Sequence, residues 1–245
     1  MNDTDVTYPP LDVPKEVAEG VFVVDSGPIR AMGIPLPVRM SAIRLGNGGL
    51  LLHSPTRYSA ALHEALERIG PIRHLVAPNS AHWTYLKEWQ DHLPQAKTWA
   101  APGLRERGQV KRSGVRLDAD LGPGRAEWDA EVDQVAVPGI GGFCEVALFH
   151  KASRTLLLTD LVQNLEPEKL PAPMRVFARL AGNAAPNGRA PAYLRAVIAL
   201  RGNLAREAAR RIVAFEPERV IFTHGAWFET DGAARLRRSL DWLLK

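Results

Sequence analysis

Three short apolar runs of this sequence each end in one ionisable residue, and this pattern constrains the fold more than any other. GLLLHSP ends in His53, TLLLTD ends in Asp160 and VIFTH ends in His224. Runs this short and this apolar are typical of buried β-strands. A fourth run, HLVAP, reaches His82 after a short polar turn. Because ligands of α/β proteins bind at the carboxyl ends of strands, we expect these four residues at one edge of a sheet.

The rest of the chain alternates strand and helix patterns. Strands are expected at VFVVDSG, on both sides of the hairpin turn GNGG, at AKTWAAP and on both sides of the glycine-rich bend in VPGIGG. Helices are expected over 58–69, after His82, at PGLRERG and over 232–245. Strands that alternate with helices in one part and pair as hairpins in another predict an α/β sandwich with mixed sheets.

Length and composition indicate one domain. The chain has 245 residues, of which 46% are hydrophobic and 24% charged. We expect a single domain over 1–245, with a proline-punctuated helical insertion or cap at 166–214. The single cysteine, Cys144, excludes an intramolecular disulfide. The first residues lack the basic and apolar segments of a signal peptide, so a cytoplasmic location is the simplest expectation.

Arginines are concentrated between residues 175 and 211, where Glu207 is the lone acidic residue. Such a stretch is most often the solvated face of arginine-rich helices, although it could face an acidic or phosphorylated substrate. Aromatic residues do not alternate with the arginines as a nucleic-acid stacking platform requires. We therefore expect no nucleic-acid partner, and a membrane surface is a less favoured alternative than a small-molecule substrate. A homo-oligomer remains open.

Five motifs follow one another along the chain in this order: LLLHSP, VAPNSAHWTYL, VPGIGG, LLLTD and IFTHG. This order resembles the metallo-β-lactamase fold superfamily over most of the chain. LHSPT, GPIRHLVAPN and LTDLVQNL are similar, more narrowly, to a bacterial family of unknown function on that fold. The resemblance implies a four-layer αββα sandwich with mixed sheets and a helical insertion. The resemblance does not indicate a substrate.

The resemblance also implies that one of the superfamily's two metal positions is lost. In the superfamily, a His-x-His-x-Asp-His loop supplies metal ligands. If His82 is its final histidine, then Ala77, Asn79 and Ala81 stand where the two earlier histidines and the aspartate are usual. Ile140 stands where a further histidine follows the "PG" bend. One metal ion is therefore expected in place of a pair.

The second metal position keeps its ligands under the same resemblance. Asp160 matches the metal-bridging aspartate, and His224 matches the last histidine. With His82 they would hold one divalent ion, zinc or iron, because two imidazoles and a carboxylate with an open position form a catalytic type of site. His53 or Glu145 would act as the general base or proton shuttle. Asn79 would donate a hydrogen bond to a developing oxyanion.

Two functions follow from this site. The first is a mononuclear metal-dependent hydrolase of unknown substrate. The alternative is a non-catalytic protein of the same fold that binds a small molecule or a partner, with its metal lost or structural. The missing ligand positions favour the alternative. Ionisable residues at four separate strand ends favour the enzyme, because in a binding protein those positions could have become apolar without cost.

Overall fold

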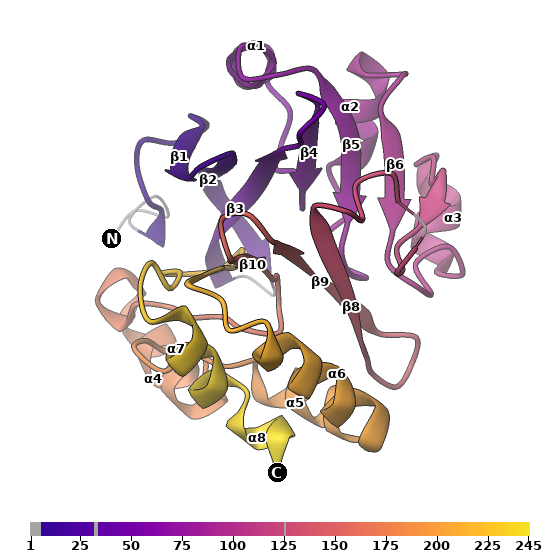
Figure 1. Ribbon diagram of the computed structural model, residues 1–245. Helices are drawn as coiled ribbons and strands as arrows, with labels where there is room; N and C mark the ends of the chain where they lie inside the picture. The colour runs from indigo at the N-terminus through magenta and orange to yellow at the C-terminus, as the bar shows by residue number, and fades with distance from the viewer. Residues whose placement is uncertain (1–5, 32–33, 125) are drawn as a thin grey trace.

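Two β-sheets lie face to face in the middle of the molecule, and helices cover the outer face of each sheet (Figure 1). The computed structural model describes residues 6–31, 34–124 and 126–245. The two sheets follow one another along the chain, the first ending before residue 121 and the second beginning at Val132. This arrangement confirms the expected mixed α/β sandwich.

The first sheet has seven strands in sequence order, β1-β2-β3-β4-β5-β6-β7. Its strands are β1 (Lys15–Ala18), β2 (Val21–Ala31), β3 (Ile34–Arg44), β4 (Leu50–His53), β5 (Ile72–Ala77), β6 (Lys97–Ala100) and β7 (Ala119–Asp120). The pairs from β1 to β4 are antiparallel, and those from β4 to β7 are parallel. The GNGG turn joins β3 to β4 as expected, and Gly48 there has a φ of +82°, which glycine adopts at little cost.

The second sheet has four strands in the order β11-β10-β9-β8. They are β8 (Val132–Pro138), β9 (Cys144–His150), β10 (Thr155–Leu157) and β11 (Arg219–Ile221). Only β10 and β11 are parallel, so the long segment between them must cross over to bring the chain back. The helices expected between residues 166 and 214 form that crossover.

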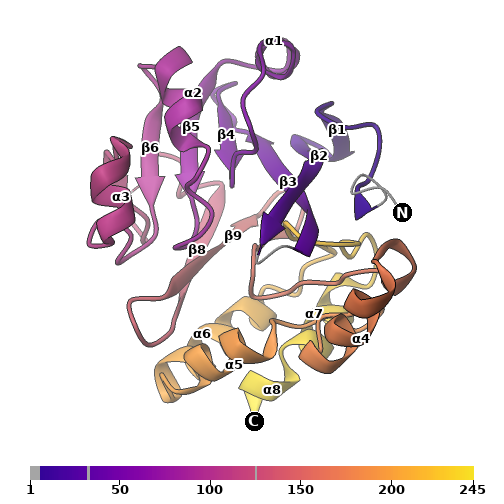
Figure 2. The ribbon, with the colours of Figure 1, turned by 180° about the vertical axis from the view of Figure 1, so that it is seen from behind.

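The helices divide between the two outer faces. The first sheet is covered by α1 (Ala60–Glu67), α2 (Leu86–His92) and α3 (Gly108–Ser113) (Figures 1 and 2). The other side of the molecule carries η2 (Pro167–Lys169), α4 (Ala172–Ala181), α5 (Ala192–Ala199), α6 (Asn203–Ala214), α7 (Gly232–Ser239) and α8 (Asp241–Leu244). Within the described residues, no helix is both long enough and apolar enough to cross a membrane.

Three apolar clusters correspond to the three interfaces of a four-layer αββα sandwich. Leu62 of α1 and Trp89 of α2 pack on the outer face of the first sheet. Trp99 of β6 and Leu148 of β9 belong to the cluster between the sheets. Ile212 of α6 belongs to the cluster on the outer face of the second sheet. Strands β4, β9 and β10 therefore have both faces buried, which explains why they read as largely apolar runs.

Two expected helices differ from the structure. The segment PGLRERG is a turn, and α3 begins only at Gly108. Gly103 has a φ of +83° and lies against the backbone of Gly142, a conformation that ends a helix. The helix expected to begin at His82 begins four residues later, at Leu86. His82 therefore lies in a turn, not on a helix.

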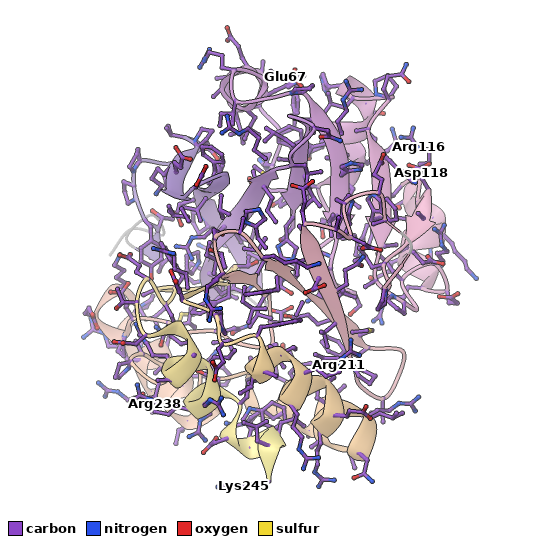
Figure 3. The ribbon with its side chains drawn as sticks, in the orientation of Figure 1. Glu67, Arg116, Asp118, Arg211, Arg238 and Lys245 are labelled. Atoms are coloured by element: carbon purple, nitrogen blue, oxygen red, sulfur yellow. The ribbon has the colours of Figure 1, made fainter. Side chains whose placement is uncertain are left out.

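The arginine-rich segment lies on the surface. All of the arginines between residues 175 and 211 are exposed or half-buried, and Arg211 of α6 and Arg238 of α7 are seen in Figure 3 on the helical side of the molecule. This placement agrees with the solvated-face interpretation of the segment.

Candidate metal centre

Asp160 and His224 follow two neighbouring parallel strands at the same offset. Leu157 of β10 is paired with Ile221 of β11, and each candidate residue comes three positions later. Neighbouring strands lie roughly 4.8 Å apart, so equal offsets bring the two side chains together. The backbone continues this pairing beyond the strands, because Asn164 N donates to His224 O over 3.1 Å. The sheet thus sets the spacing of two ionisable groups.

His82 reaches the same place from the first sheet. Its Nε2 lies 3.2 Å from Asp160 Oδ2, and His224 Nε2 lies 3.5 Å from Asp160 Oδ1. One ligand atom from each of the three residues lies within 4.8 Å of the other two. The structure therefore brings together the three residues that the sequence analysis singled out as metal ligands.

The second nitrogen of each imidazole has its own partner. His224 Nδ1 lies 2.8 Å from the carbonyl oxygen of Pro37. A carbonyl only accepts, so Nδ1 carries the proton and Nε2 presents a lone pair towards Asp160. His82 Nδ1 lies 2.7 Å from Ser54 Oγ, which leaves its Nε2 facing Asp160 as well. Bonds of this kind to the outer nitrogen are what orient histidine ligands in metal sites.

The Asp160 carboxylate is held by two amides. Asn79 Nδ2 donates to Oδ2 over 2.8 Å, and Gln163 Nε2 donates to Oδ1 over 3.0 Å. Asn79 is completely buried, and its Oδ1 accepts from the backbone N–H groups of Ala81 and His82. The same side chain therefore positions both Asp160 and the turn that carries His82.

This arrangement changes the role expected for Asn79. Its Nδ2 lies within hydrogen-bond distance of Thr159 Oγ1 and Glu145 Oε2 in addition to Asp160. Both of its amide hydrogens are thus engaged inside the protein, and none points to a substrate oxyanion. The geometry makes Asn79 a positioning residue.

Glu145 is also a positioning residue in this geometry. It lies on β9 with no solvent exposure. Its Oε1 accepts from Thr159 N over 2.8 Å, and its Oε2 accepts from Asp160 N and Leu161 N over 2.8 and 3.1 Å. Glu145 does not line the cleft, so the proton-shuttle role expected for it has no path to a substrate here. The carboxylate instead fixes the loop that carries Asp160, which is the reason for an acidic residue inside an apolar strand.

His53 ends β4 and is 1% exposed. Its Nε2 is buried, with no hydrogen-bond partner among the described residues. Burial, together with the neighbouring His82, lowers the pKa of His53 to about 3. His53 is therefore a neutral imidazole behind His82, and it does not reach the wall of the cleft.

Charges within the centre favour an ionised Asp160. Burial raises its pKa, but His82 and His224 more than offset burial, so its pKa lies well below the usual range. Burial lowers the pKa of His82, but the Asp160 carboxylate reverses this and the pKa is raised. At His224 burial prevails over Asp160, and the pKa is lowered. A cation binds an ionised carboxylate and neutral imidazoles, so a metal ion at this centre would have to displace a proton from His82.

The centre opens into a cleft of about 540 Å³. Its walls include His82, Asp160, His224, Tyr85, Tyr193 and two arginines, Arg30 and Arg57. The volume is within the range of roughly 300–1,000 Å³ that is common for small-molecule sites. None of the arginines between residues 175 and 211 lines it.

Three contributors to the centre were not identified from the sequence: Ser54, Gln163 and Arg39. Arg39 is 2% exposed, and its Nη1 donates to the carbonyls of Phe222 and Gly225, on either side of His224. The sequence does indicate a role for Arg39, because an arginine inside the apolar strand PVRMSAI needs a buried partner. Ser54 and Gln163 carried no such signal, because polar residues next to strand ends are common.

Gly225 explains the glycine of the IFTHG motif. Its φ is +95°, and a Cβ there would lie 2.1 Å from Asn164 O. Only glycine permits this close approach, which ties the His224 loop to the segment after Asp160.

The sandwich of two face-to-face sheets with helices on both outer faces has the metallo-β-lactamase fold. A family model described as a domain of unknown function (DUF4336) matches residues 28–106. No curated protein sequence matches the chain.

Solved structures support the fold over nearly the whole chain. A crystal structure of DIM-1 metallo-β-lactamase has a TM-score of 0.63 at 15% identity, covering 94% of this chain and 95% of that one. The metallo-β-lactamase from Hirschia baltica has a TM-score of 0.59 at 15% identity, covering 94% and 96%. The one from Pontibacter korlensis has 0.58 at 13% identity, covering 94% and 97%. At these identities the likeness concerns the fold.

Proposed function

We propose that this chain is a mononuclear metal-dependent hydrolase that acts on a small molecule. The observation that carries the proposal is the approach of His82, Asp160 and His224 to within 4.8 Å of one another. Two imidazoles and one carboxylate fit a zinc or iron ion, and the tautomer of His224 leaves the correct nitrogen free. The buried network behind the three residues is of the kind that supports metal ligands.

A divalent ion in this centre would supply Lewis-acid chemistry, polarising a substrate oxygen and lowering the pKa of a water molecule towards about 7. The chain's own residues would do the rest. Asn79 and Gln163 hold the Asp160 carboxylate in place, while Ser54 and the Pro37 carbonyl hold the two imidazoles. Tyr193 lines the cleft, and its phenol would donate to a substrate oxygen.

The alternative is a binding protein with the same cleft and no reaction. It is favoured by the absence of an imidazole at Ala77, Asn79 and Ile140, where the resemblance implies further histidines. Ile140 is 41% exposed and lies outside the cleft. The His-Asp-His cluster does not require those positions, so we rank the hydrolase first.

Metal content separates these two functions. Protein purified without a histidine tag or chelator should contain about one zinc or iron per chain by elemental analysis. Asp160→Ala and His224→Ala should each lose the ion. His63→Ala is the matched control, because His63 lies on α1 away from the cluster and should leave the metal content unchanged. A folded His224→Ala protein with full metal content would rule out the proposed centre.

A further inference from the structure

A second cavity of about 450 Å³ lies directly beside the cleft, against α4. Its lining is predominantly apolar and includes Leu36, Leu165, Leu170, Met174, Phe177 and Leu180. Gln163, Leu36 and Tyr193 line both this cavity and the cleft. Because the two cavities share walls, a ligand in one can extend into the other. We call the second cavity the α4 groove.

Side-chain size shapes the α4 groove. Small residues lie at Ala178, which is 2% exposed, and at Ala181. Phe177 and Leu180 are larger and keep 54% and 80% of their surface exposed. Exposed apolar residues that gather around one cavity often mark a ligand or partner site. The helix thus leaves room over its small residues and has apolar side chains at the rim.

Asn183, in the wall of the α4 groove, has one buried polar atom without a partner. Asn183 is 5% exposed and lines the groove. Its Nδ2 donates to Gln163 Oε1 over 2.9 Å, and Gln163 Nε2 donates in turn to Asp160. Its Oδ1 is buried with no hydrogen-bond partner among the residues that the structure describes.

The identity of that atom follows from Asp160. An ionised carboxylate only accepts, so Gln163 must present its nitrogen to Asp160 and its oxygen to Asn183. Asn183 must then donate with its nitrogen, which leaves its oxygen as the unpaired atom. A buried acceptor without a donor costs on the order of 1–3 kcal/mol. Because this oxygen is covered, a donor on a ligand in the groove would remove that cost once the Asn183 side chain turns towards it.

We propose that the substrate is an amphiphile whose apolar chain lies in the α4 groove and whose amide N–H or hydroxyl donates to Asn183 Oδ1. Its reacting group would then lie in the cleft beside His82, Asp160 and His224. This inference rests on the proposed function for the reaction, but the binding of the substrate's apolar chain does not need the metal. The apolar lining selects the chain, and the single acceptor selects the donor.

Calorimetric titration of metal-stripped protein tests the inference. The probes are N-methylbutanamide, N-methylhexanamide and N-methyloctanamide, each paired with the methyl ester of the same acid, which has no N–H donor. Burying a CH₂ group gives about a fourfold gain in affinity, so each two-carbon step should tighten binding about fifteenfold. Each amide should also bind more tightly than its ester. Equal affinity across chain lengths would overturn the inference.

Two variants locate the binding. Ala181→Trp fills the α4 groove and should abolish the dependence on chain length. Val176→Trp is the matched control, because Val176 is on the same helix, 57% exposed and outside the groove lining, and it should bind like the wild type. Asn183→Leu should remove the advantage of amide over ester while keeping the dependence on chain length. If the Ala181→Trp protein kept the wild-type dependence of affinity on chain length, binding in the α4 groove would be refuted.

The outcomes for the two proposals are distinguishable. Chain-length-dependent binding in a protein that never holds a metal would support the groove and refute the hydrolase. Stoichiometric metal with no dependence on chain length would support the metal centre and refute the groove.

Discussion

Asp25 and Arg39 face each other across β2 and β3, with Arg39 Nη2 lying 2.6 Å from Asp25 Oδ1. Both side chains are almost completely buried, and Lys15 also contacts Asp25. The same guanidinium donates to two carbonyls that flank His224. This ion pair therefore connects the first sheet to a loop of the candidate metal centre.

Arg39→Met should destabilise the protein by about 3–5 kcal/mol, because it leaves a buried carboxylate with only Lys15 and two carbonyls without their donor. Urea unfolding measures the change. Arg44→Met, at an exposed position of the same strand, should change the free energy of unfolding by less than about 0.5 kcal/mol. Equal effects of the two substitutions would show that the buried pair has no special importance.

Glu145→Gln should lower the free energy of unfolding by about 1–3 kcal/mol or more, since it weakens a charged acceptor of three backbone N–H groups and can turn an amide N–H towards them. Glu106→Gln, at an exposed site, is the control. If Glu145 acted mainly as a proton shuttle, the variant would keep its stability. Unchanged unfolding would therefore contradict the positioning role.

Ser54→Ala should weaken metal binding roughly 10–100-fold, because it removes the partner that orients His82. Competition with a chromogenic chelator measures the affinity. Ser80→Ala is the control, since Ser80 lies in the same turn region but its hydroxyl has no hydrogen bond within the described part of the chain. Equal affinities for the two variants would exclude a role of Ser54 in positioning His82.

His53 should make stability depend on pH in the acidic range. Its pKa is about 3 in the folded protein against 6.5 for an unperturbed histidine, so the unfolded chain binds the extra proton between these values. Stability from the neutral His53 is therefore complete above pH 6.5 and is lost as the pH falls towards 3.

The measurement is the slope of unfolding free energy against pH for wild type and His53→Gln. The wild type should lose more stability on acidification, by up to about 1.4 kcal/mol for each pH unit. Comparing slopes cancels the other histidines, which are the same in both proteins. Parallel slopes would mean that the pKa of His53 is the same in the folded and the unfolded protein.

The strands and the centre could be predicted because they leave a local trace in the sequence. A buried strand reads as an apolar run, and an ionisable residue at its end is conspicuous, as for Asp160 and His224. The edge that these residues share followed from the parallel strand rule. His82 was expected at that same edge, but it follows β5 of the other sheet and reaches Asp160 from there. The turn around it was also mistaken for a helix start.

The roles of Glu145 and Asn79 could not be predicted, because they depend on contacts between distant segments. Glu145 accepts from residues 14 to 16 positions away, and Asn79 donates to a residue 81 positions away. Sequence spacing does not show whether such a side chain faces a cleft or a backbone. The turn at PGLRERG was also missed because it depends on a contact between distant segments. Gly103 there lies against the backbone of Gly142.

The parallel pairing of β10 with β11 has a consequence for how this centre can change. Backbone hydrogen bonds set the spacing of Asp160 and His224, and Glu145 and Arg39 add side-chain contacts to the same loops. His82 stands on a loop that is held by side chains, chiefly Asn79 and Ser54. The spacing of Asp160 and His224 is therefore more constrained than the position of His82. A change in the preferred metal ion would be expected to arise from substitutions in the His82 loop rather than in the sheet.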